Sequence, residues 1–143
     1  VEEALSLLKQ YDMHASMGMM VHFAIADRSG RHAAVEYINN EMVVTETPVL
    51  TNFYLAEGEK NGIGTSQSHE RFQILTDRLA QTPVMTETDV RDALSSVSKG
   101  NFGEFESTEW SIVMNLTTGE ALYYHRENYQ NQYLFAIERR LSQ

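Results

Sequence analysis

Residues 22–52, HFAIADRSGRHAAVEYINNEMVVTETPVLTN, decide the fold of this chain. Two turn signals divide their apolar segments: a glycine-containing turn at 27–30, and the pair Asn39 and Asn40, which tolerates positive φ. Consecutive strands joined by such short loops pair antiparallel. The stretch therefore predicts an antiparallel meander, with strands at 21–26, 32–38 and 42–45 and a short strand at 49–51 after Pro48.

Helical patterns lie on both sides of this meander. Residues 1–10 carry their apolar side chains on one helical face, and residues 66–79 do the same, with Ser66 as the expected N-cap. A third helix is expected at 85–97, where Thr86 would be the N-cap and Asp89 its imperfect capping-box partner.

The remaining part of the chain reads as three more strands, at 110–116, 121–125 and 133–137. The order is then helix, strands, two helices and strands. Runs of strands separated from runs of helices indicate the α+β class, with an antiparallel sheet and helices packed on it. At 143 residues, the chain is long enough for one domain with a sizeable core.

Composition excludes several classes of function. The formal net charge of -9 argues against binding to nucleic acid or to an anionic membrane, because both depend on Lys and Arg. The chain has no cysteine, which excludes disulfides and thiolate metal sites. Its five histidines show no HxH or HxxxH spacing, so we expect neither a metal nor a cofactor. No apolar run approaches the roughly 18 residues that span a bilayer.

Two polar residues stand at expected element boundaries. Asn52 follows the apolar end of the meander, where an amide N–H could donate to a developing oxyanion or simply form a turn. Arg71 lies near the start of the helix at 66–79 and could lower the pKa of a neighbouring nucleophile or pair with Glu70 or Asp77. The residues alone leave both alternatives open.

Other chemistry has little support in the sequence. The segment 64–68 is not a G-x-S-x-G elbow, so Ser66 and Ser68 are weak candidates for a nucleophile. Phosphate-binding patterns of the GxGxxG or Walker type are absent.

Five short motifs, in this order, resemble the C-terminal half of the choloylglycine hydrolase family. That family contains linear-amide C–N hydrolases such as penicillin V acylases and bile salt hydrolases. The similarity extends over nearly the whole chain, including the helix before the meander. The motifs are IADRSG at 25–30, VEY at 35–37, LTN at 50–52, SHER at 68–71 and the Trp-Ser pair at 110–111.

The resemblance implies an αββα four-layer sandwich and the mechanism of an N-terminal-nucleophile (Ntn) hydrolase. In such enzymes an N-terminal cysteine attacks the amide and its own α-amine acts as the base. Asn52 would supply an oxyanion donor, and Arg71 would lie close to the thiol. The cysteine, a nearby aspartate and the second oxyanion donor belong to the N-terminal half. Residues 1–143, which have no initiator Met, are then expected to be the C-terminal portion of such a domain, inactive alone.

Further expectations follow from this resemblance. The substrate would be a small N-acyl amide, with penicillin V, conjugated bile acids and acyl-homoserine lactones all suitable. The missing half would be the partner, the protein would form a homo-oligomer, and its location would be the bacterial cytoplasm. The apolar residues next to the site could line the substrate pocket, although each could equally be core: Met17, Met19, Met20, Phe53 and Tyr54.

Two other functions remain open at this point. The same meander could belong to a non-catalytic domain that binds an apolar ligand or mediates assembly, with the Met-rich segment as the ligand wall. It could also belong to a plain structural α+β module. A cysteine encoded upstream of Val1, with an aspartate about 20 residues after it, would favour the hydrolase.

Overall fold

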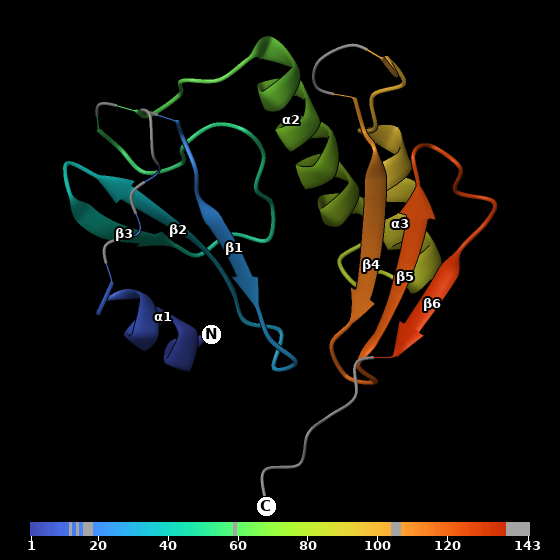
Figure 1. Cartoon of the computed structure of the whole chain (residues 1–143), viewed down its shortest axis with the longest axis horizontal. Helices are drawn as coiled ribbons and strands as arrows, with labels where there is room; N and C mark the ends of the chain where they lie inside the picture. The colour runs from blue at the N-terminus through green and yellow to red at the C-terminus, as the bar shows by residue number, and fades with distance from the viewer. Residues whose placement is uncertain (12, 14, 16–18, 59, 104–106, 137–143) are drawn as a thin grey trace, which may run out of the picture. The chain divides into compact units, whose positions relative to one another are not determined.

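The computed structural model of the chain describes residues 1–11, 13, 15, 19–58, 60–103 and 107–136 (Figure 1). Their contacts define two compact units, Val1–Gln73 and Ile74–Gln143. Each unit has one three-stranded antiparallel sheet, and the described residues form three helices in all. The predicted α+β class is confirmed at this level.

The first unit contains helix α1 (Glu2–Leu8) and a meander of strands β1 (Phe23–Ala26), β2 (His32–Ile38) and β3 (Glu41–Thr45). Strand β2 is central and pairs antiparallel with both neighbours, as Figure 1 shows. Between β2 and β3, Asn39 and Asn40 have φ of 50° and 66°, which confirms the predicted turn. Two such residues in a two-residue loop are typical of a type I′ hairpin.

The short strand predicted at 49–51 is wrong, because this segment pairs with no strand among the described residues. Its polar groups form local contacts instead. The hydroxyl of Thr47 donates to the carbonyl of Val49 at 2.8 Å and accepts from its N–H at 3.2 Å. Such side-chain bonds compete with a β-ladder for the same backbone groups.

The core of the first unit is built around β2. Ala34 and Val35 are fully buried, and Ile38 forms a buried cluster with Tyr54 and Ala56. Successive side chains of a strand point to opposite faces, so Tyr37 points away from this cluster. Its hydroxyl donates to the carbonyl of Leu8 at 3.4 Å, which ties the end of α1 to the sheet.

Helix α2 (Ser66–Gln81) begins in the first unit and ends in the second. The second unit also contains helix α3 (Glu87–Ser96) and strands β4 (Trp110–Asn115), β5 (Glu120–His125) and β6 (Tyr133–Ala136). The expected start of α3 is confirmed, and its capping box is complete. The hydroxyl of Thr86 accepts from the backbone N–H of Asp89, and the carboxylate of Asp89 accepts from the backbone N–H of Thr86. Ile137, the last residue of the predicted final strand, lies outside the described residues.

Helix α3 packs on one face of the β4–β5–β6 sheet. The buried residues there are Val113, Tyr124 and Tyr129, against which Val90 and Leu94 of α3 pack. The hydroxyls of Ser111 and Tyr129 lie 3.0 Å apart within this interface. An amphipathic helix on an antiparallel sheet is what the apolar stripe of α3 predicts.

The opposite face of the same sheet is apolar and exposed. The strand register pairs Ile112 of β4 with Tyr123 of β5, and Tyr123 with Tyr133 of β6. Trp110 and Met114, two residues before and after Ile112, lie on the same face by the alternation of side chains along β4. Phe135 belongs to the same face by the alternation of side chains along β6. Four of these residues are more than half exposed: Trp110 60%, Met114 56%, Tyr133 58% and Phe135 57%. We call this surface the apolar sheet face.

Candidate functional site

The site begins with the segment that follows β3. Thr51 is buried, and its hydroxyl donates to the carbonyl of Ser68 at 2.9 Å. This bond joins the segment to the first turn of α2, 17 residues later in the chain. Asn52, the next residue, is exposed. The predicted oxyanion donor is therefore anchored at its backbone and accessible at its side chain.

The start of α2 places the second predicted residue. Helix α2 begins at Ser66, and the preceding Thr65 accepts the N–H of Ser68 at 3.2 Å through its hydroxyl. The N-cap is therefore Thr65, one residue before the predicted Ser66. Ser66 is exposed, whereas Ser68 is buried and its hydroxyl lies 3.1 Å from that of Thr65.

Arg71 turns toward Asn52. Its Nη2 donates to Oδ1 of Asn52 at 2.6 Å and to the hydroxyl of Ser68 at 3.3 Å, while its Nε donates to the carbonyl of Gln67 at 3.2 Å. The backbone bond fixes the guanidinium along the helix, one turn from Gln67. The structure thus brings together the two residues that the sequence predicts as catalytic.

This contact decides the orientation of the Asn52 amide. A guanidinium has only donors, so the group that faces it has to be the amide oxygen. The amide nitrogen of Asn52 then points away from Arg71 and can donate to another acceptor. Such a fixed N–H donor is the element that an oxyanion site requires.

Phe53 and Tyr54 fix the backbone on the other side of Asn52. The ring of Phe53 stacks on His69 with centroids 4.1 Å apart and meets Phe72 edge-on at 5.3 Å. Tyr54 is buried, and its hydroxyl donates to the carbonyl of Val21 at 2.6 Å. Of the two expected pocket residues, Phe53 therefore packs on α2 and Tyr54 is part of the core.

The two methionines expected in the pocket differ in exposure. Met19 is 54% exposed, whereas Met20 packs against the buried cluster of Ile38, Tyr54 and Ala56. Met17, also considered for an acyl-binding wall, lies outside the described residues. Met20 is thus part of the packing around the core of the first unit.

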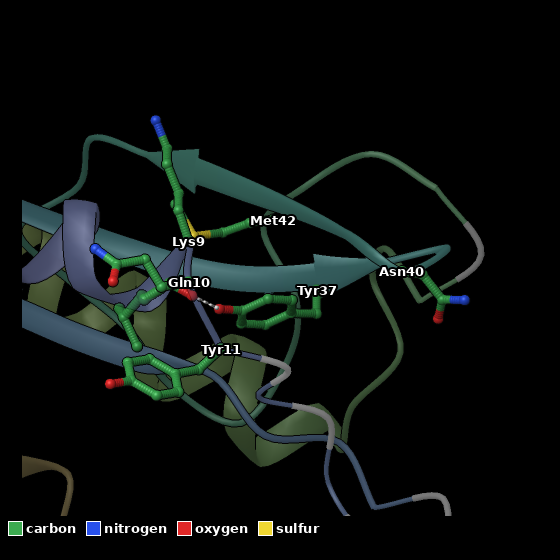
Figure 2. Close-up of a pocket in the computed structure, with 7 residues that line it drawn as sticks. Lys9, Gln10, Tyr11, Tyr37, Asn40 and Met42 are labelled. Atoms are coloured by element: carbon green, nitrogen blue, oxygen red, sulfur yellow. Dashed lines mark hydrogen bonds between the residues drawn. The ribbon is translucent and has the colours of Figure 1, made fainter.

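A cavity of about 640 Å³ opens elsewhere on the first unit (Figure 2). It lies between the end of α1 and the β2–β3 hairpin, and Figure 2 shows the Tyr37 hydroxyl pointing to the backbone at its wall. None of the predicted site residues lines it. The lining residues are Leu8, Lys9, Gln10, Tyr11, Tyr37, Asn40 and Met42.

Within the described ranges, no group of three or more His, Cys, Asp or Glu residues is arranged to hold a metal ion. In the same part of the chain, the helices are too short or too polar to cross a membrane. Asn52 and Arg71 themselves contribute an amide group and a cation.

Sequence reasoning missed the residues that support this pair. Thr51 and Ser68 anchor the backbone, and Glu36 accepts N–H groups from Leu55 and Ala56. A signal for Glu36 was present: it shares the inner side of a predicted strand with Ala34 and Ile38, by the period of two. A carboxylate at such a position has to be satisfied internally.

Comparisons of the chain with protein-family models, with curated proteins and with solved structures find no match.

Proposed function

We propose that this chain is the C-terminal part of a cysteine-dependent Ntn hydrolase that cleaves the linear C–N bond of small N-acyl amides. The observation that carries the proposal is the bond from Arg71 to Oδ1 of Asn52, because it turns the amide N–H of Asn52 outward. The ordered motifs that resemble the choloylglycine hydrolase family give this pair its two roles. Penicillin V and conjugated bile acids are the substrate types that the resemblance suggests.

Asn52 is the oxyanion donor of the proposed reaction. When a nucleophile attacks the amide carbonyl, the oxygen gains negative charge, and a preorganised N–H stabilises it without reorganisation. One such donor is worth about 3–4 kcal/mol in other hydrolases. The anchor from Thr51 to Ser68 and the bond from Arg71 supply the preorganisation.

Arg71 has a second role in the proposal. Its positive charge next to the attacking sulfur favours the thiolate, which is the reactive form of cysteine. The chain has no cysteine, so the sulfur has to come from residues outside these 143. This half of the enzyme then supplies the oxyanion donor and the cation, and the other half supplies the nucleophile and its base.

The other half would also complete the fold. In the proposed αββα sandwich each sheet is covered by helices on one face and by the second sheet on the other. The apolar sheet face of β4–β6, opposite α3, supports such a partner, because large exposed apolar surfaces on soluble proteins mark interfaces. The same observation also favours the second candidate, a non-catalytic assembly domain.

The test starts from the longer protein encoded together with the sequence upstream of Val1. We expect an N-terminal cysteine after processing, hydrolysis of penicillin V or of a conjugated bile acid, and loss of activity when that cysteine is replaced by alanine. The pure 143-residue chain is the control and should be inactive. Amidase activity of this chain alone, abolished by Asn52→Ala, would contradict the proposal, and an upstream region without cysteine would favour the assembly domain.

A further inference from the structure

Glu36 is a fully buried carboxyl in the central strand of the first unit. It lies on β2 with 0% of its surface exposed, between the core residues Val35 and Ile38. Burying a carboxyl among apolar residues is costly unless its oxygens are fully hydrogen-bonded. The bonds of this group therefore identify what it stabilises.

Both oxygens of Glu36 receive N–H groups. The N–H of Leu55 lies 2.9 Å from Oε1 and 3.1 Å from Oε2, and the N–H of Ala56 lies 2.7 Å from Oε2. Nδ1 of His22 lies 3.1 Å from Oε1 and is the third hydrogen-bond partner of this side chain. One side chain thus holds two successive backbone amides and one ring.

These amides follow Asn52 by three and four residues. The other side of Asn52 is fixed by Thr51, whose hydroxyl bonds to α2. Tyr54, between the two anchors, donates to the carbonyl of Val21 and stacks on His22 with ring centroids 5.6 Å apart. The residue that presents the amide is therefore held by α2 before it and by the Glu36–His22 pair after it.

We propose that Glu36 is a positioning residue for the candidate site, which holds Asn52 in place through the N–H groups of Leu55 and Ala56. The importance of Asn52 for catalysis rests on the proposed function, but the geometric claim does not. Glu36 acts only through the backbone and touches no substrate. His22 is the third hydrogen-bond partner of the Glu36 side chain, and its ring stacks on Tyr54.

An isosteric amide cannot replace this carboxylate. In Glu36→Gln one terminal group becomes NH₂, and in either orientation it faces a backbone N–H donor, of Ala56 at the Oε2 position or of Leu55 at the Oε1 position. A donor–donor contact in a buried site costs the full desolvation of the unpaired groups. The substitution should therefore release the 52–56 segment while β1, β2 and β3 keep their pairing.

The experiment is NMR of the ¹⁵N-labelled 143-residue chain. In Glu36→Gln we expect the amide hydrogens of Leu55 and Ala56 to exchange about 10- to 100-fold faster. We also expect shifts of the side-chain resonances of Asn52 and of Nε–H of Arg71, with strand amides unchanged. Glu41→Gln, which removes the same charge from an exposed position on β3, should change neither.

Two outcomes would overturn the proposal: Asn52 and Arg71 signals that stay in place while Leu55 and Ala56 lose protection, or a uniform loss of protection across the sheet. If Glu36→Gln does not fold, His22→Phe is the second variant, since it keeps an aromatic ring on Tyr54 and removes only one bond. It should shift the same signals by less, and unchanged Asn52 signals there would also overturn the proposal. Amidase assays of the longer protein test the proposed function separately. If that protein is inactive but the NMR changes occur as expected, the proposed function is wrong and the positioning role of Glu36 is still supported.

Discussion

Nη2 of Arg71 donates to Oδ1 of Asn52 across 2.6 Å, between residues 19 positions apart in the chain. This contact links the end of the meander to the first turns of α2. The contact matters because it turns the amide nitrogen of Asn52 away from Arg71. With the oxygen of the amide engaged by a cation, the nitrogen is the group of this exposed side chain that can donate to another acceptor.

The first prediction concerns this amide in the longer protein, with its cysteine nucleophile, that we propose above. Asn52→Ala should lower kcat about 10²- to 10³-fold for an N-acyl amide substrate, with KM changed little, because the N–H acts on charge that develops in the transition state. Steady-state kinetics measure both constants. Asn131→Ala, at an exposed position of the second unit, is the matched control and should keep wild-type kinetics. A rise in KM with kcat unchanged would show that Asn52 only binds substrate.

The second prediction concerns the buried anchor of Asn52. Thr51→Val keeps the volume of the side chain but removes the hydroxyl that donates to the Ser68 carbonyl. The first unit should lose about 1 kcal/mol of unfolding free energy, the usual value of one hydrogen bond. Urea titration, followed by the amide signals of β1–β3, measures this loss. Thr45→Val on β3 is the control, and its free energy of unfolding should stay within about 0.5 kcal/mol of the wild type. Equal losses in both variants would show that the bond from Thr51 to Ser68 does not stabilise the first unit.

The third prediction concerns Gly64, just before α2. A Cβ at this position would lie 2.7 Å from Cβ of Phe53 and 2.9 Å from the carbonyl oxygen of Asn52. Because these atoms are close to the backbone, Gly64→Ala should move the Asn52 segment and cost about 1–3 kcal/mol. NMR shifts at residues 51–54, together with urea unfolding, report both effects.

The control for Gly64 is Gly100→Ala. Its added Cβ meets only the carboxyl end of Glu127, which can rotate away. This variant should unfold like the wild type. If the two alanine variants behave alike, close packing of Gly64 against the Asn52 segment is not important.

The pattern of polar and apolar residues predicted most of the local structure, because that information is short-range. The turn at Asn39 and Asn40 and the capping box of Thr86 and Asp89 depend on residues at most a few positions apart. The error at 49–51 has the same origin. An apolar run can pair as a strand, but here the hydroxyl of Thr47 forms hydrogen bonds with the backbone of Val49. The alternation of polar and apolar residues does not predict this competing contact.

The site was predictable only in part. Asn52 and Arg71 were singled out by their positions at element boundaries and by the family resemblance, whereas their mutual contact depends on a long-range arrangement. The roles of Thr51, Ser68 and Glu36 depend on the same arrangement, since each bond spans 17 residues or more in the chain. Tyr54 illustrates the converse: its ring was a candidate for the pocket, and the fold buries it.

The fourth prediction concerns the N-cap of α3 and its dependence on pH. The hydroxyl and N–H of Thr86 hold the pKa of Asp89 below its usual value. An acid with a lowered folded-state pKa stabilises the fold above its unfolded-state pKa, and this contribution is lost as the pH falls through the folded-state pKa. Thr86→Ala should cost about 1 kcal/mol at neutral pH through the lost cap.

The stability gap between wild type and Thr86→Ala should therefore narrow as the pH falls below about 4, the usual pKa range of Asp. Thermal unfolding at a series of pH values measures the gap. Thr86→Ser keeps the hydroxyl and should follow the wild type. A gap that is constant from neutral to acid pH would show that Asp89 does not take part in the cap.

The fifth prediction concerns the apolar sheet face. Tyr133 and Phe135 of β6 lie on this face, together with Trp110, whereas Leu134 lies on the opposite face of the same strand. An exposed aromatic surface next to an edge strand favours self-association. The isolated chain should therefore sediment as a concentration-dependent oligomer and bind a hydrophobic dye.

The double variant Tyr133→Thr and Phe135→Thr should lower both the association and the dye binding, because it removes aromatic surface from this face and keeps a residue that favours strands. Leu134→Thr is the control, since Leu134 is as exposed, at 61%, but on the other face. Sedimentation velocity and the emission of Trp110 distinguish the two variants. If Leu134→Thr reduces association as much as the double variant, the strand edge rather than the face mediates it, and a monodisperse wild-type chain that binds no dye would remove the argument for a partner on this sheet.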